Sequence, residues 1–170
     1  MSAGDRGRPK KNGRARRWGV VVAALVVVAD QAVKWWVLVG IMAPPRTIPV
    51  TPFFNLVLTW NRGISFGLLN SQQAWNAWLL PVIAVVIVVV LAFWLSRAES
   101  RPLALAFGMV IGGAIGNVVD RLRFDGAVMD FLDLHLFGYH WPAFNVADAA
   151  ISLGAVALVL QSLFGRAKTH

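Results

Sequence analysis

The sequence predicts an all-α membrane protein, a bundle of four transmembrane helices with a small β-containing periplasmic element between the first and second spans. Of its 170 residues, 58% are apolar and 14% are charged, whereas a soluble domain carries about a quarter charged residues. The apolar residues form four long runs, and a helix needs about 20 such residues to cross a bilayer. The runs are Trp18–Val39, Ala74–Leu95, Leu103–Val119 and Ala143–Phe164.

The basic residues predict the orientation of the bundle, because cytoplasmic segments carry an excess of Lys and Arg. Seven of them precede the first span, and Arg97 and Arg101 lie between the second and third spans. We therefore expect both termini in the cytoplasm. The predicted parts are a disordered basic tail (residues 1–17), a four-helix transmembrane domain (residues 18–165) and a short cytoplasmic tail (residues 166–170).

The net charge of +8 does not predict a nucleic-acid partner, because most of this charge lies in segments expected beside anionic lipid. The alternative for the first span is a cleaved signal peptide. No small-x-small cleavage site follows its apolar run Gly19–Ala29, which favours a retained span. The absence of cysteine excludes disulfides, thiolate metal sites and a cysteine nucleophile.

The segment Gly40–Gln73 is too long and too mixed to be a simple turn. Four prolines lie near its start, and Phe53–Trp60 is rich in β-branched and aromatic residues. That composition predicts a short strand or an element lying on the membrane. The sequence Asn61-Arg62-Gly63 then predicts a turn.

Ionisable residues inside a span are costly, so each indicates function or pairing. In the first span, Asp30 and Lys34 are four residues apart, the spacing of an ion pair on one helix face. In the third span, Gly108, Gly112 and Gly116 form a stripe that lets another helix approach closely.

The remaining polar residues converge at the outer ends of the third and fourth spans. Asn117, Asp120 and Arg121 share one helix face at the end of the third span, and Asn145 and Asp148 begin the fourth. The loop between these spans supplies two more acids. When two carboxylates come close in a low-dielectric site they share a proton, which is the chemistry of an aspartic hydrolase. The two loop acids are Asp130 and Asp133.

Other chemistries fit the residues less well. A Ser–Lys hydrolase would use Ser65 with Lys34, but Lys34 already has a same-helix acid. A metal site at His135 and His140 lacks a helix-spaced pair of ligands. A small transporter or proton-relay subunit needs ionisable groups through the midplane, and the second span has none. A non-catalytic assembly factor leaves the clustered acids unexplained.

Five blocks of the chain, taken in order, resemble the lipoprotein signal peptidases, the type II signal peptidases of bacterial inner membranes (aspartic peptidase family A8). The resemblance spans roughly Val20–Ala155. The blocks are Asp30-Gln31-Ala32-Val33-Lys34, Asn61-Arg62-Gly63-Ile64-Ser65-Phe66, Gly112-Gly113-Ala114-Ile115-Gly116-Asn117-Val118-Val119-Asp120-Arg121, Val128-Met129-Asp130-Phe131 and Phe144-Asn145-Val146-Ala147-Asp148.

The resemblance implies an aspartic endopeptidase that removes the signal peptide from diacylglyceryl-modified prolipoproteins, just before the lipidated cysteine. It implies no metal or cofactor, inhibition by globomycin-like cyclic peptides, and an active site on the periplasmic side of the inner membrane. By the family's pattern, the catalytic pair is Asp130 and Asp148. The residues expected to bind substrate or support the pair are Asn117, Arg121, Asn145, Asp120, Asp30, Lys34 and Asn61.

Two features depart from the family's pattern. Ile64 stands where the family has a small residue, and the basic tail of residues 1–17 is longer than expected and lies outside the resemblance.

Overall fold

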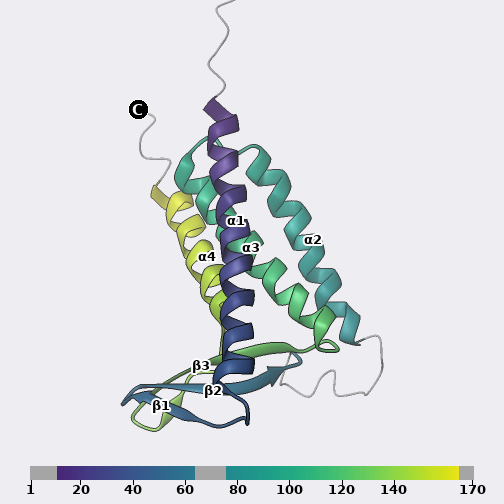
Figure 1. Cartoon of the computed structure of the whole chain (residues 1–170). Helices are drawn as coiled ribbons and strands as arrows, with labels where there is room; N and C mark the ends of the chain where they lie inside the picture. Colours follow the sequence, from purple (N-terminus) through teal and green to yellow (C-terminus); the bar gives the residue numbers. More distant parts are fainter. Residues whose placement is uncertain (1–10, 64–75, 165–170) are drawn as a thin grey trace, which may run out of the picture.

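The computed structural model describes residues 11–63 and 76–164, and it confirms four helices long and apolar enough to cross a membrane. They pack side by side, and α1 begins at the end of the bundle where α4 finishes (Figure 1). The short tail predicted for residues 166–170 lies outside the described part of the chain. The helices are α1 (Lys11–Trp36), continued by a π-helical turn (Val37–Ile41), α2 (Asn76–Ser96), α3 (Arg101–Arg123) and α4 (Val146–Phe164).

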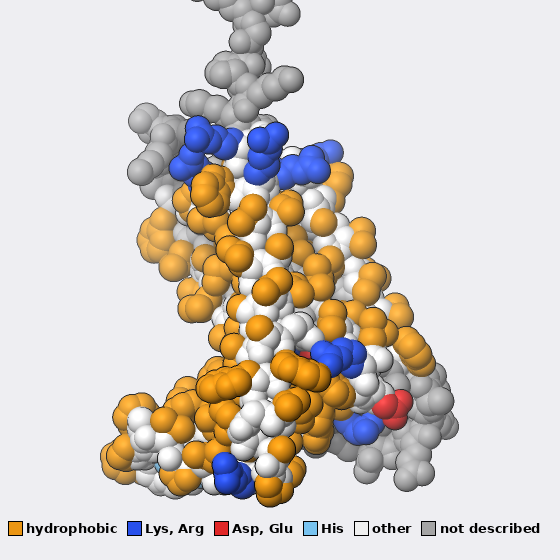
Figure 2. Space-filling view, viewed as in Figure 1, with side chains coloured by type: hydrophobic (Ala, Val, Ile, Leu, Met, Phe, Trp, Pro, Cys, Tyr) orange, Lys and Arg blue, Asp and Glu red, His pale blue; other side chains and the backbone are white. Residues whose placement is uncertain are grey.

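Helix α1 begins at Lys11, seven residues before the predicted start at Trp18, so residues 11–17 are helical rather than part of a disordered tail. The extension is held by packing, because Ala15 near the start of α1 is buried in a cluster with Leu95 at the end of α2 and Ala98 just after that helix. Figure 2 shows Lys and Arg side chains gathered at this end of the bundle, away from the sheet. Residues 1–10 lie outside the described chain.

A four-stranded antiparallel sheet closes the opposite end of the bundle (Figure 1), with the strand order β1-β2-β3-β4. The sequence predicted β structure only between the first two spans, but half of the sheet comes from the connection between α3 and α4. A strand such as β2 needs partners for its backbone N–H and C=O groups, and β3 supplies them along its length. The strands are β1 (Ile48–Thr51), β2 (Phe54–Asn61), β3 (Val128–Leu136) and β4 (Tyr139–His140).

Helix α3 is the centre of the bundle and packs against α1, α2 and α4. Its start is capped by Ser100, whose hydroxyl accepts a hydrogen bond from the Leu103 N–H. The predicted glycine stripe is where α1 comes closest, since a Cβ on Gly112 would lie 2.6 Å from the backbone oxygen of Ala23. A Cβ on Gly113 would likewise collide with the backbone of α4 at Ala147. Glycine therefore brings both neighbouring backbones against α3.

A buried ion triad joins the helices near the sheet. The Nζ of Lys34 lies 2.9 Å from Asp30 Oδ2 on its own helix and 2.8 Å from Asp120 Oδ2 on α3. Each acid also accepts a backbone hydrogen bond: Asp30 Oδ1 accepts from the Ala147 N–H of α4, and Asp120 Oδ2, the oxygen paired with Lys34, also accepts from the Met129 N–H of β3. One ammonium group thus links α1, α3, α4 and β3.

We expect Lys34→Met to lower the free energy of unfolding by about 3–5 kcal/mol, because it leaves two buried carboxylates without their cation. Thermal or denaturant unfolding in detergent measures this loss. The matched control is Arg62→Met, because Arg62 pairs with Asp125 only at the surface, 3.9 Å away, and its removal should change stability little. Equal stability of the two variants would contradict a structural role for the triad.

Candidate active site

The candidate site begins at the first turn of α4, where Asn145 and Asp148 cap the helix. The Asn145 Oδ1 accepts a hydrogen bond from the Asp148 N–H at 2.9 Å, and the Asp148 Oδ2 accepts one from the Asn145 N–H at 3.3 Å. This reciprocal pair is a capping box, which the spacing Asn-x-x-Asp allows. The cap fixes the Asp148 carboxylate at the positive end of the α4 dipole.

Asp130 approaches the same place from the sheet. It lies on β3 opposite Thr59 of β2, and 1% of its surface is exposed. Its Oδ1 accepts from Asn145 Nδ2 at 2.7 Å and its Oδ2 accepts from Asn61 Nδ2 at 3.0 Å. The strand and the two amides therefore hold this carboxylate with both oxygens engaged.

Asn117 of α3 connects the second carboxylate to the ion triad. Its Nδ2 donates to Asp148 Oδ1 at 2.7 Å, and its Oδ1 accepts from Asn145 Nδ2 at 3.3 Å and from the Lys34 ammonium at 3.5 Å. The two acids are thus joined through two amide side chains and, beyond them, through a buried cation. This network fixes the acids relative to each other.

The two acids have different surroundings. Burial raises the pKa of Asp130 to about 6, and the nearby Asp148 carboxylate adds to the rise, while hydrogen bonds from Asn61 and Asn145 act against it. Asp148 is half-buried, so part of its surface remains accessible. A buried acid that keeps its proton to a higher pH than an ordinary aspartic acid, beside a more accessible partner, is suited to general acid–base catalysis.

Arg121 lies one turn beyond Asn117 on α3, within electrostatic reach of Asp148 and Asp130. Its Nη1 lies 3.5 Å from the Asn117 backbone oxygen, and its buried Nε has no hydrogen-bond partner. This N–H is a donor without an acceptor beside the two acids.

The structure brings all nine sequence-predicted site residues into one cluster, and it separates Asp133 from them. Asp133 is three residues from Asp130 on β3, but it bonds to Asn55 Nδ2 at 2.8 Å and to His140 Nδ1 at 2.9 Å. Burial raises the pKa of Asp133, but the hydrogen bonds with Asn55 and His140 outweigh it and hold the pKa below its ordinary value. Asp133 is therefore an ionised anchor of the sheet.

Sequence reasoning gave no role to Gln31, which bridges α1 and α3. Its Nε2 donates to Asp120 Oδ1 at 2.9 Å and to Asp30 Oδ2 at 3.2 Å, and its Oε1 accepts from Arg123 at 3.1 Å. The available signal was a polar side chain between two ionisable residues of one span.

The alternative chemistries find little support in the structure. Lys34 is held by two carboxylates, and Ser65 and Ile64 lie outside the described residues. Within residues 11–63 and 76–164, no three His, Cys, Asp or Glu side chains group as metal ligands. Helix α2 carries no ionisable residue for a proton relay.

Known proteins match this chain over most of its length. Residues 22–164 match the family of signal peptidase (SPase) II. The lipoprotein signal peptidase of Oleidesulfovibrio alaskensis is 47% identical over 82% of this chain and 90% of its own length. That of Methylobacterium sp. (strain 4-46) is 42% identical over 88% and 91%.

The fold comparison points the same way. A bacterial membrane enzyme whose structure was solved by the in meso method at 2.3 Å superposes with a TM-score of 0.75 at 26% identity, covering 89% of this chain and 91% of the other. The chain therefore belongs to the signal peptidase II family of aspartic peptidases.

Proposed function

We propose that this protein removes the signal peptide of diacylglyceryl-modified prolipoproteins, just before the lipidated cysteine, by activating water between Asp130 and Asp148. The observation that carries the proposal is the pair of acids, one from the sheet and one from a helix cap, bonded to the same Asn145. Family membership supports lipoprotein signal peptide cleavage. The geometry supports the choice of these two acids.

In the proposed mechanism the pair holds one proton, which the raised pKa of Asp130 favours on that carboxyl. The ionised Asp148 takes a proton from water, and the water oxygen attacks the scissile carbonyl. The protonated Asp130 donates to the carbonyl oxygen. Collapse of the tetrahedral intermediate then breaks the C–N bond. The leaving amine takes the proton that Asp148 accepted from water, and Asp130 recovers its proton as the carboxyl product forms.

The neighbouring side chains position the pair and the substrate. Asn117, Asn145 and Asn61 hold the carboxylates by their amide donors. The Nε–H of Arg121 has no partner among the described residues, and its proposed role is to donate a hydrogen bond to a carbonyl oxygen of the bound precursor. Asp30, Lys34 and Asp120 support this layer from within the bundle, and no cofactor takes part in the proposed reaction.

The position of the pair suits a substrate held in the membrane. The acids lie where the apolar helices meet the sheet, at the opposite end from the cluster of basic side chains (Figures 1 and 2). Because basic segments stay cytoplasmic, we propose that the site faces the periplasmic side of the inner membrane. A precursor anchored by acyl chains and an apolar signal helix would reach it laterally from the lipid. Globomycin-like cyclic peptides are expected to inhibit by occupying the same site.

We expect Asp130→Asn and Asp148→Asn each to lower the turnover of a diacylglyceryl-modified precursor by about 10²–10⁴-fold or more, because each removes one partner of the acid–base pair. Cleavage in liposomes, followed by gel shift or mass spectrometry, measures the effect. Asp133→Asn is the matched control on the same strand and should retain most activity. A similar loss in all three variants would reject the assignment of the pair.

The pH profile should reflect the proton on Asp130. Raising the pH through about 6 removes that proton, so kcat/KM should fall on the alkaline side. Hydrogen bonds to a carboxylate stabilise its charged form, and Asn61→Ala removes one of them. The alkaline limb should therefore shift to higher pH in Asn61→Ala and stay in place in Arg62→Met. A limb that does not move in Asn61→Ala would show that Asp130 does not govern it.

A further inference from the structure

The outer part of β3, its turn and β4 form an amphipathic hairpin beyond the active site. Leu136 pairs with Tyr139, and the Trp141 N–H donates to the Leu134 oxygen, so these four side chains share one face. Residue pairs that face each other across antiparallel strands lie on the same side of the sheet. The opposite face therefore carries the other pair, His135 and His140.

The polar face of the hairpin is occupied by its own contacts. His135 and His140 stack with their ring centroids 4.9 Å apart, and His140 bonds to Asp133, which also accepts from Asn55. On this face the buried Nε2 of His135 has no hydrogen-bond partner within the described residues.

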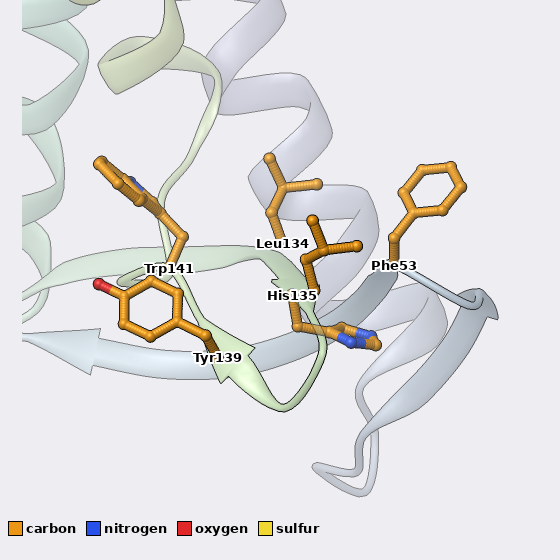
Figure 3. A pocket seen from close by; sticks show the side chains of 6 residues that line it. Phe53, Leu134, His135, Tyr139 and Trp141 are labelled. Carbon is orange, nitrogen blue, oxygen red and sulfur yellow. The ribbon is translucent and has the colours of Figure 1, made fainter.

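The apolar face has no partner in the described chain. Leu136 is 62% exposed, Tyr139 68% and Trp141 61%. These side chains line an open groove of about 410 Å³, together with Phe53, Leu134 and His135. Figure 3 shows Phe53, Leu134 and Trp141 on the side of the ribbon facing the helix bundle, whereas His135 points the other way. The apolar face is therefore turned toward the region that the membrane fills around the helices.

The hydrophobic surface of the helices continues onto this face. Figure 2 shows hydrophobic side chains running from the helices onto the sheet. At the sheet end of α1, Trp35 and Trp36 are 59% and 61% exposed, and aromatic side chains collect at membrane–water boundaries. Exposed apolar patches of this kind mark contact with a membrane or a protein. Because this patch is continuous with the surface of the lipid-facing helices, contact with lipid is favoured over contact with a protein.

We propose that this hairpin is a membrane anchor, with Leu134, Leu136, Tyr139 and Trp141 inserted into the lipid at the sheet end of the bundle. Leu134 lies on the same face of β3 as Asp130, about 13 Å along the strand at 3.3 Å per residue. The anchor therefore sets the depth of the proposed catalytic pair relative to the lipid. This last consequence rests on the proposed function, whereas insertion does not.

The chain contains no cysteine, so single cysteines can be placed on either face of the hairpin. Tyr139→Cys and His140→Cys are neighbours on opposite faces, and Leu136→Cys is a second reporter on the apolar face. Each full-length variant is labelled with a nitroxide in phosphatidylethanolamine–phosphatidylglycerol vesicles. Spin relaxation by oxygen and by a water-soluble nickel chelate then gives the exposure of each label to lipid and to water.

We expect labels at 139 and 136 to relax mainly with oxygen, at a depth of about 5–10 Å, the usual depth of interfacial elements. The label at 140 should relax mainly with the nickel chelate. Equal access of the chelate to positions 139 and 140 would overturn the proposal. Shielding of 139 and 136 from both reagents would also overturn it, in favour of a protein partner or a second copy.

If Tyr139→Cys does not fold, Leu136→Cys decides the result. Because the measurement requires no peptide cleavage, failure of the anchor can be distinguished from failure of the proposed function.

Discussion

The buried ammonium group of Lys34 is the contact on which the rest of the site depends. A charge in an apolar bundle is stable only when it is paired and hydrogen-bonded, and Lys34 meets this condition with one acid from α1 and one from α3. The second bonds of those acids fix the start of α4 and the start of β3. The two elements that carry Asp148 and Asp130 are therefore held by the same ion triad.

The site shows how one residue type takes different roles on one short strand. Asp130 and Asp133 both lie on β3 and both are buried. Burial and the nearby second acid raise the pKa of Asp130, so it holds a proton more tightly, although its hydrogen bonds with Asn61 and Asn145 act against this. Asp133 is bonded to Asn55 and faces His140, so it is kept as an anion. The environment of each carboxyl group, rather than its position in the sequence, separates the acid from the structural anchor.

The sequence predicted the elements whose signal is local. Apolar runs located all four helices, and the β-branched segment located β2. Strand β3 was missed because Val128–Leu136 does not alternate along its whole length: its first half is buried in the core, and only its second half alternates at the surface. Its partner β2 also lies in a distant loop. Residue spacing alone could not choose between Asp130 and Asp133, since the choice depends on contacts with Asn61, Asn145 and His140. The choice came from the family resemblance, and the hydrogen bonds supply its physical reason.

The central claim is that this buried network hydrolyses lipidated precursors at the membrane surface. The most direct measurement offers purified protein in liposomes the same prolipoprotein with and without diacylglycerol on its cysteine, and identifies the products by mass spectrometry. We expect cleavage of the lipidated precursor alone, on the N-terminal side of the modified cysteine. Equal cleavage of the unlipidated precursor, or cleavage at another position, would contradict the account.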